Sequence, residues 1–201
     1  MRQMIFKRFE RFWHWSQSLL IIFMMVTGFE ISGAYSLLGF ETALYWHEIS
    51  AITLIVLWIF AIFWHFTTGE WKQYIPTTEK LTAVIAYYSK DIFLGKPHPY
   101  KPTPERKMNP LQRFSYLGFK LLLAPVIWVS GLLLLAYPFG IRLLPLDSLS
   151  AIHLVTAFLI LVFLIVHIYM TTTGPTPLSH IKTMVTGYEE TTEDEKYAST
   201  K

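Results

Sequence analysis

The chain contains no cysteine among its 201 residues. This absence excludes disulfide bonds, cysteine-ligated iron–sulfur clusters, thiolate metal sites and the C-x-x-C-H site of covalent haem attachment. Charged residues are also scarce, at 15%, whereas hydrophobic residues make up 53% of the chain and aromatic residues 16%. Such a chain is too apolar for an ordinary soluble domain, and we expect one helical membrane domain over residues 1–201.

Two other classes of function find no support in the sequence. The net charge is only +3, and the basic residues are grouped by loop rather than in one stripe, so we expect no nucleic-acid binding. The chain has no nucleotide-binding motif and no soluble segment large enough for a substrate site. We therefore expect the centre that converts the primary substrate to lie on a partner chain.

Four long apolar stretches are expected to cross the membrane as helices, at residues 12–34, 43–66, 111–137 and 149–172. Pro125, in the middle of the third stretch, predicts a kink there. Residues 78–95 carry apolar positions at helical spacing and predict an amphipathic helix on the membrane lipid surface. The expected fold is all-α, an integral membrane four-helix bundle with this interfacial helix between spans two and three.

The distribution of basic residues predicts the orientation of the spans. Lysine and arginine are concentrated in the N-terminal segment and in the loop of residues 67–109, whereas the other two connections almost lack them. The positive-inside rule then places both termini in the cytoplasm. His47 and His153 consequently lie near the outer surface, whereas His167 lies near the inner surface with His14 or His65. His98 and His180 fall in loops, where we expect solvated side chains.

These depths predict two cofactor sites. His153 and His167 are fourteen residues apart on the fourth span, so both rings lie on nearly one face, about 21 Å apart along the axis. Two imidazoles facing each other at one depth of an apolar bundle are what a six-coordinate haem b requires. We call His47 and His153 the outer pair, and they predict one haem b. A second haem b is predicted at His167 with His14 or His65.

Two glycines fit the same interpretation. Gly28 lies fourteen residues after His14 and therefore on nearly the same face, at the depth of the outer pair, where it would leave room for a flat macrocycle. Gly131 in the third span could do the same. The alternative is that both glycines only allow helices to pack closely.

A histidine-lined transporter is the main alternative to a cytochrome. Such a protein would need acidic partners near the middle of the membrane. The acidic residues close to the spans, Glu30, Glu41 and Glu48, instead cluster at the outer edge. Haem ligation therefore explains the histidine pattern better.

Short motifs along almost the whole chain carry a resemblance to a known family. They are His14-Trp15 after a basic start, His47, Asn109-Pro110-Leu111-Gln112, Ser130-Gly131, Ile152-His153 and Val166-His167-Ile168-Tyr169-Met170. On these motifs the chain resembles the cytochrome b membrane (gamma) subunits of bacterial respiratory formate dehydrogenases. The cytochromes b of thiosulfate reductase and nickel–iron hydrogenase are close relatives of that family.

The resemblance implies a set of iron ligands. The outer haem would be held by His47 and His153, and the inner haem by His14 and His167. We call His14 and His167 the inner pair. The resemblance thus selects His14 over His65, which would then be a supporting or quinone-site residue.

The resemblance also implies a quinone site beside the inner haem, near Asn109. Asn109 and Gln112 are neutral donors and acceptors that could hold the oxygens of menaquinone or ubiquinone. The alternative is that Asn109 and Pro110 only start a helix, since asparagine suits the N-cap and proline the first turn.

The implied function is electron transfer in anaerobic respiration. Electrons would pass between an extracytoplasmic iron–sulfur subunit, itself joined to a catalytic subunit, and the quinone pool of the bacterial inner membrane. Formate is the expected substrate of that complex. Thiosulfate or polysulfide reduction and hydrogen oxidation are the alternatives.

Overall fold

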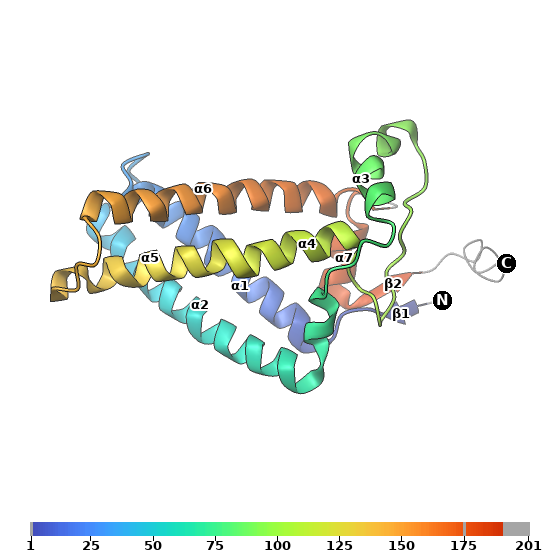
Figure 1. Cartoon of the computed structure of the whole chain (residues 1–201), viewed down its shortest axis with the longest axis horizontal. Helices are drawn as coiled ribbons and strands as arrows, with labels where there is room; N and C mark the ends of the chain where they lie inside the picture. Colours follow the sequence, from blue (N-terminus) through green and yellow to red (C-terminus); the bar gives the residue numbers. More distant parts are fainter. Residues whose placement is uncertain (1, 175, 191–201) are drawn as a thin grey trace. The chain divides into compact units, whose positions relative to one another are not determined.

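A computed structural model describes residues 2–174 and 176–190 of the chain. In this part of the chain, four helical segments are long and apolar enough to cross a membrane: Arg8–Ile31 (α1), Phe40–Thr68 (α2), Pro110–Phe139 and Leu146–Thr171 (α6). They are the long helices of Figure 1. The expected all-α membrane fold is confirmed.

The helices begin and end a few residues away from the predicted spans, and local interactions explain the largest differences. α1 begins at Arg8 because the Glu10 carboxylate accepts a hydrogen bond of 2.7 Å from the Lys7 backbone N–H, as in a capping box. It ends before Gly33, whose φ of 85° terminates a right-handed helix. α2 likewise continues past the predicted end until Gly69, which adopts the left-handed conformation.

The third span is built from four segments rather than one regular helix. These are α4 (Pro110–Gly118), the π-helical turn η3 (Phe119–Leu123), α5 (Ala124–Ala136) and the 3-10 turn η4 (Tyr137–Phe139). Proline has no backbone N–H and its ring collides with the carbonyl four residues earlier, which for Pro125 is that of Leu121. The wider π turn relieves this conflict, so the irregularity expected at Pro125 occurs as a π turn just before it.

The chain forms two compact units. Unit 1 contains the described residues of 1–14, 71–115 and 167–201, and unit 2 contains residues 15–70 and 116–166. Most of each of the four long helices therefore belongs to unit 2, which is a four-helix bundle.

The core of unit 2 joins all four helices. Leu54 and Trp58 of α2 pack with Ala124 of α5, and partly buried side chains of α1 cover them. α6 is attached through aromatic contacts, with the ring of Phe158 5.0 Å from that of Phe29. Apolar packing thus fixes the mutual position of the helices that carry the outer pair.

Unit 2 is apolar outside and partly polar inside. Its buried residues include Thr27, Ser50, Ser130 and Thr156, whereas Phe63, Leu121 and Val162 are all more than half exposed. Small hydroxyl residues between helices and large apolar residues outside are typical of a bundle whose surface faces lipid.

The acidic residue Glu30 organises the connection between α1 and α2. It is 5% exposed, and its Oε1 accepts backbone hydrogen bonds of 2.6–2.8 Å from Leu37, Leu38 and Gly39. Its carboxylate therefore closes a loop at the end of unit 2. Glu30 thus has a local structural role in this loop.

Unit 1 is made of short elements. They include β1 (Arg2–Met4), η1 (Glu70–Tyr74, mostly in this unit), α3 (Leu81–Ser89), η2 (Asp91–Leu94), α7 (Ser179–Thr186) and β2 (Tyr188–Glu190). β1 and β2 pair antiparallel, with Gln3 opposite Glu189. α3 is the helix predicted between spans two and three; it has nine residues and buries Val84 and Tyr87.

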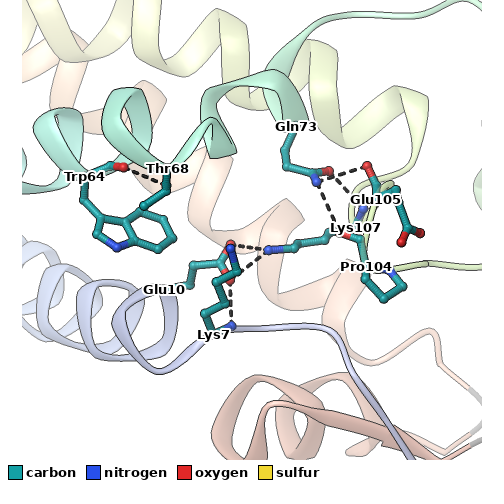
Figure 2. A network of polar contacts seen from close by, with 8 residues as sticks. All are labelled: Lys7, Glu10, Trp64, Thr68, Gln73, Pro104, Glu105 and Lys107. Atoms are coloured by element: carbon teal, nitrogen blue, oxygen red, sulfur yellow. Dashed lines mark hydrogen bonds and ion pairs between the residues drawn. The ribbon is translucent and has the colours of Figure 1, made fainter.

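A buried ion pair holds unit 1 together. The Lys107 Nζ lies 2.7 and 2.9 Å from the two carboxylate oxygens of Glu10. Figure 2 marks this ion pair. The two side chains are only 4% and 11% exposed. Gln73 extends the network, because its Oε1 accepts from the Lys107 backbone N–H and its Nε2 donates to the Glu105 carbonyl. The middle loop is thereby tied to the start of α1.

Candidate functional site

The structure brings the two histidines of the outer pair together in unit 2. His47 lies near the start of α2 and His153 near the start of α6. Their ring centroids are 6.2 Å apart and the rings are inclined by 71°. Both residues lie inside their helices, so the packing of the bundle brings the two rings to the same place.

The two glycines singled out in the sequence lie against these histidines. A Cβ atom at Gly28 would stand 3.0 Å from the His47 Cε1, and one at Gly131 would stand 3.1 Å from the His153 Cε1. The absence of a side chain at each glycine lets the imidazole ring lie this close to α1 or α5. That the two glycines also leave room for a macrocycle stays a prediction.

Each glycine is preceded by a hydroxyl residue that contacts the same imidazole. The Thr27 Oγ1 is 3.1 Å from the His47 Nδ1, and the Ser130 Oγ is 3.0 Å from the His153 Nδ1. Both hydroxyl residues are buried. Sequence reasoning did not assign Thr27 a role and noted Ser130 only in a motif, although the repeated hydroxyl-glycine dipeptide was a signal that could have been used.

The histidines of the inner pair also face each other, within unit 1. The rings of His14 in α1 and His167 in α6 have centroids 6.1 Å apart and are inclined by 50°. His65 lies in unit 2 and is 7% exposed. Its Nδ1 donates a hydrogen bond of 2.6 Å to the Ala61 carbonyl, and its ring packs edge-on against Trp64. The structure therefore pairs His167 with His14.

Both separations suit an iron atom between the rings. A metal–imidazole bond is about 2.0 Å long and the nitrogen lies roughly 1.1 Å from its ring centre, so two opposed ligands have centroids about 6.2 Å apart. The observed 6.2 and 6.1 Å agree with this value. The donor set of two neutral imidazoles in apolar surroundings is also that of a six-coordinate haem b. The residues present thus fit two such groups.

Asn109 and Gln112 form a reciprocal cap at the start of α4. The Asn109 Oδ1 accepts from the Gln112 backbone N–H, and the Gln112 Oε1 accepts from the Asn109 backbone N–H, both at 2.9 Å. This is a capping box with Pro110 at the first helical position. Asn109 and Pro110 therefore do start a helix, as the alternative interpretation expected. The side-chain Nδ2 of Asn109 lies 3.3 Å from the Tyr88 hydroxyl.

A polar cluster that sequence reasoning missed surrounds this hydroxyl in unit 1. The His98 Nε2 is 3.2 Å from the Tyr88 hydroxyl, and Thr173, just after α6, is also hydrogen-bonded to Tyr88. The expectation that His98 is a solvated loop residue is wrong, because its ring packs on Tyr87 with a centroid distance of 4.5 Å. The adjacent tyrosines and the following histidine were visible in the sequence, but their convergence depends on the loop path.

Burial shifts the proton affinities of this cluster. It lowers the pKa of His98 below its ordinary value and raises that of Tyr88. The pKa of His180 is also lowered, first by burial and then by the nearby His98, so this ring is not simply solvated either. At neutral pH the cluster therefore consists of uncharged donors and acceptors.

Two comparisons with known proteins both point to a cytochrome. The chain matches the family described as prokaryotic cytochrome b561 over residues 5–187, a range that contains both histidine pairs. A protein of Escherichia coli (strain K12) named "Putative cytochrome YdhU" is 29% identical over 199 residues, covering 92% of this chain and 73% of that protein. No solved structure matches the chain.

Proposed function

The chain belongs to the prokaryotic cytochrome b561 family, and on this basis we propose that it is a di-haem b, quinone-reactive subunit of a respiratory complex. As a family member it is a multi-pass membrane cytochrome that transfers electrons through haem b. The proposal adds the number of haems, their ligands, the quinone site and the partners. It places the protein in a bacterial inner membrane with both termini in the cytoplasm.

One observation carries the proposal of two haems. The described residues include two facing imidazole pairs, and the ring centroids of each pair are separated by a distance that would allow both rings to bind one iron. We assign His47 and His153 to an outer haem and His14 and His167 to an inner haem. Bis-imidazole haem exchanges single electrons. The residues of this chain supply the nitrogen ligands, hold their orientation and exclude water.

The partners follow from the resemblance and from the absence of cysteine. Any iron–sulfur cluster that delivers electrons must be held by another chain. We propose that the partner is an extracytoplasmic iron–sulfur subunit joined to a formate dehydrogenase catalytic subunit, and that the complex works in anaerobic respiration.

Purification of the chain with its native partners tests this proposal. Molybdenum or tungsten in the complex supports formate dehydrogenase or a thiosulfate or polysulfide reductase, and substrate assays separate these. Nickel and iron would point to a hydrogenase.

We place the quinone site at the start of α4. Asn109 and Gln112 retain amide N–H donors after making their capping box, and the Tyr88 hydroxyl adds a further polar group. The Tyr88 hydroxyl is also hydrogen-bonded to Thr173, which follows His167 by six residues in the sequence. This contact connects the proposed quinone site to the chain segment that carries His167. A quinone at this place would draw protons from the cytoplasmic side, so turnover would contribute to the membrane potential.

The purified complex is expected to contain two haems b per copy of this chain. Pyridine haemochrome analysis against the measured amount of polypeptide gives the number. Zero or one haem would overturn the assignment of both histidine pairs. A haem-free chain with a transport activity would instead support the transporter alternative.

Asn109→Ser is expected to slow quinone turnover while both haems remain reducible by the electron donor. Serine preserves the N-cap acceptor, whereas the amide donor is lost, and a hydrogen bond of about 1.4 kcal/mol corresponds to roughly tenfold in rate. The measurement is haem reoxidation by added quinone in the intact complex. Asn109→Ala, which also removes the cap, should slow it at least as much. Unchanged reoxidation in both variants would leave Asn109 as a helix cap only.

A further inference from the structure

The outer pair is held by two matching groups of residues on different helices. Thr27-Gly28 of α1 lies against His47, and Ser130-Gly131 of α5 lies against His153. In both groups the hydroxyl oxygen is about 3 Å from the Nδ1, and a Cβ atom added to the glycine would stand 3.0 or 3.1 Å from the neighbouring ring atom, Cε1. Two dipeptides far apart in the sequence thus surround their imidazole rings in the same way.

The hydrogen bonds of the hydroxyl groups define which ring nitrogen carries the proton. The Thr27 hydroxyl donates to the Phe23 carbonyl at 3.0 Å, and the Ser130 hydroxyl donates to the Val126 carbonyl at 2.7 Å. A hydroxyl has a single hydrogen, so each oxygen faces the imidazole as an acceptor. The Nδ1 must then be the donor.

This assignment fixes the tautomer of both rings. With Nδ1 protonated in a neutral ring, the Nε2 lone pair of both histidines is available to a metal.

We propose that Thr27-Gly28 and Ser130-Gly131 are positioning elements that set the tautomer and ligand strength of the outer pair, and through them the reduction potential of the outer haem. This inference rests on the proposed haem ligation. An imidazole that donates from Nδ1 is a more basic ligand and favours the oxidised iron. The glycines have a steric role, because a side chain there would push the ring away from its hydroxyl partner.

The test compares Thr27→Val with Thr27→Ser in the complex purified with its native partners. Valine has nearly the shape of threonine but accepts no hydrogen bond, whereas serine keeps the acceptor. Redox titration followed at the haem absorbance should show an upward shift of one haem potential in Thr27→Val and recovery towards the wild-type value in Thr27→Ser. The other haem serves as an internal reference and should keep its potential.

Ser130→Ala tests the second group independently. It should shift the same haem in the same direction, and the double variant Thr27→Val/Ser130→Ala should shift it further, because the two hydroxyls bind opposite ligands. Thr53→Val is a matched control, since this exposed α2 threonine also donates to a carbonyl four residues earlier, that of Ile49. It should leave both potentials unchanged.

The outcomes separate this inference from the function on which it rests. A wild-type complex without b-type haem would overturn both. Two haems whose potentials stay unchanged in Thr27→Val and in Ser130→Ala would overturn the positioning role alone. Because the two substitutions are on different helices, poor assembly of one variant leaves the other to decide.

Discussion

His153→Ala is expected to abolish the outer haem alone, and His167→Ala the inner haem alone. Both residues lie on α6, fourteen positions apart, which corresponds to about 21 Å of helix axis. A cofactor held by one residue should therefore not depend on the other. Each variant would remove one of the two histidines that would hold one haem and leave the other histidine pair intact, so each should retain one haem b per chain.

The partner histidines provide the matched controls for this prediction. His47→Ala should reproduce the spectrum of His153→Ala, and His14→Ala that of His167→Ala. His65→Ala should retain two haems, because the structure bonds this ring to its own helix. Reduced-minus-oxidised spectra and pyridine haemochrome counts of the purified complexes measure all five. If His65→Ala loses the inner haem and His14→Ala keeps it, the inner ligand assignment is wrong.

The second large effect is expected at the buried ion pair of unit 1. Glu10→Ala should destabilise the protein by about 3–5 kcal/mol, because the buried ammonium of Lys107 would lose its carboxylate. The Glu10 carboxylate also accepts a hydrogen bond from the Lys7 backbone N–H at the start of α1. Its loss would therefore destabilise the first turn of the helix that carries His14. Reversible unfolding in mixed detergent micelles, followed by circular dichroism, gives the free-energy difference.

A double variant and an exposed pair serve as controls. Glu10→Gln with Lys107→Met removes both charges and should recover most of the stability, since a buried pair often contributes little net free energy relative to neutral residues. Glu79→Ala breaks the exposed pair with Arg106, whose side chains are 60% and 61% exposed, and should cost less than about 1 kcal/mol. Equal losses in Glu10→Ala and Glu79→Ala would contradict the special role of the buried pair.

Much of the fold was accessible from the sequence because the membrane restricts the choices. A backbone in hydrocarbon must satisfy its own hydrogen bonds, so a long apolar stretch is necessarily a helix. The four long helices accordingly begin and end within a few residues of the expected spans. The differences at the ends come from local capping, such as the Glu10 cap that starts α1 at Arg8, which apolar character does not reveal.

The sequence alone determined that two histidines lie on one side of the fourth helix, fourteen residues apart, because helical geometry converts spacing directly into direction and depth. Spacing and depth left the partner of His167 open between His14 and His65, and the family resemblance selected His14. His98 was expected in solvent. Helix packing, which depends on many small contacts, brought His14 to His167 and closed the middle loop over Tyr88 and His98. Packing also placed Gly28 and Thr27 against His47, a match between helices that no spacing along one chain segment encodes.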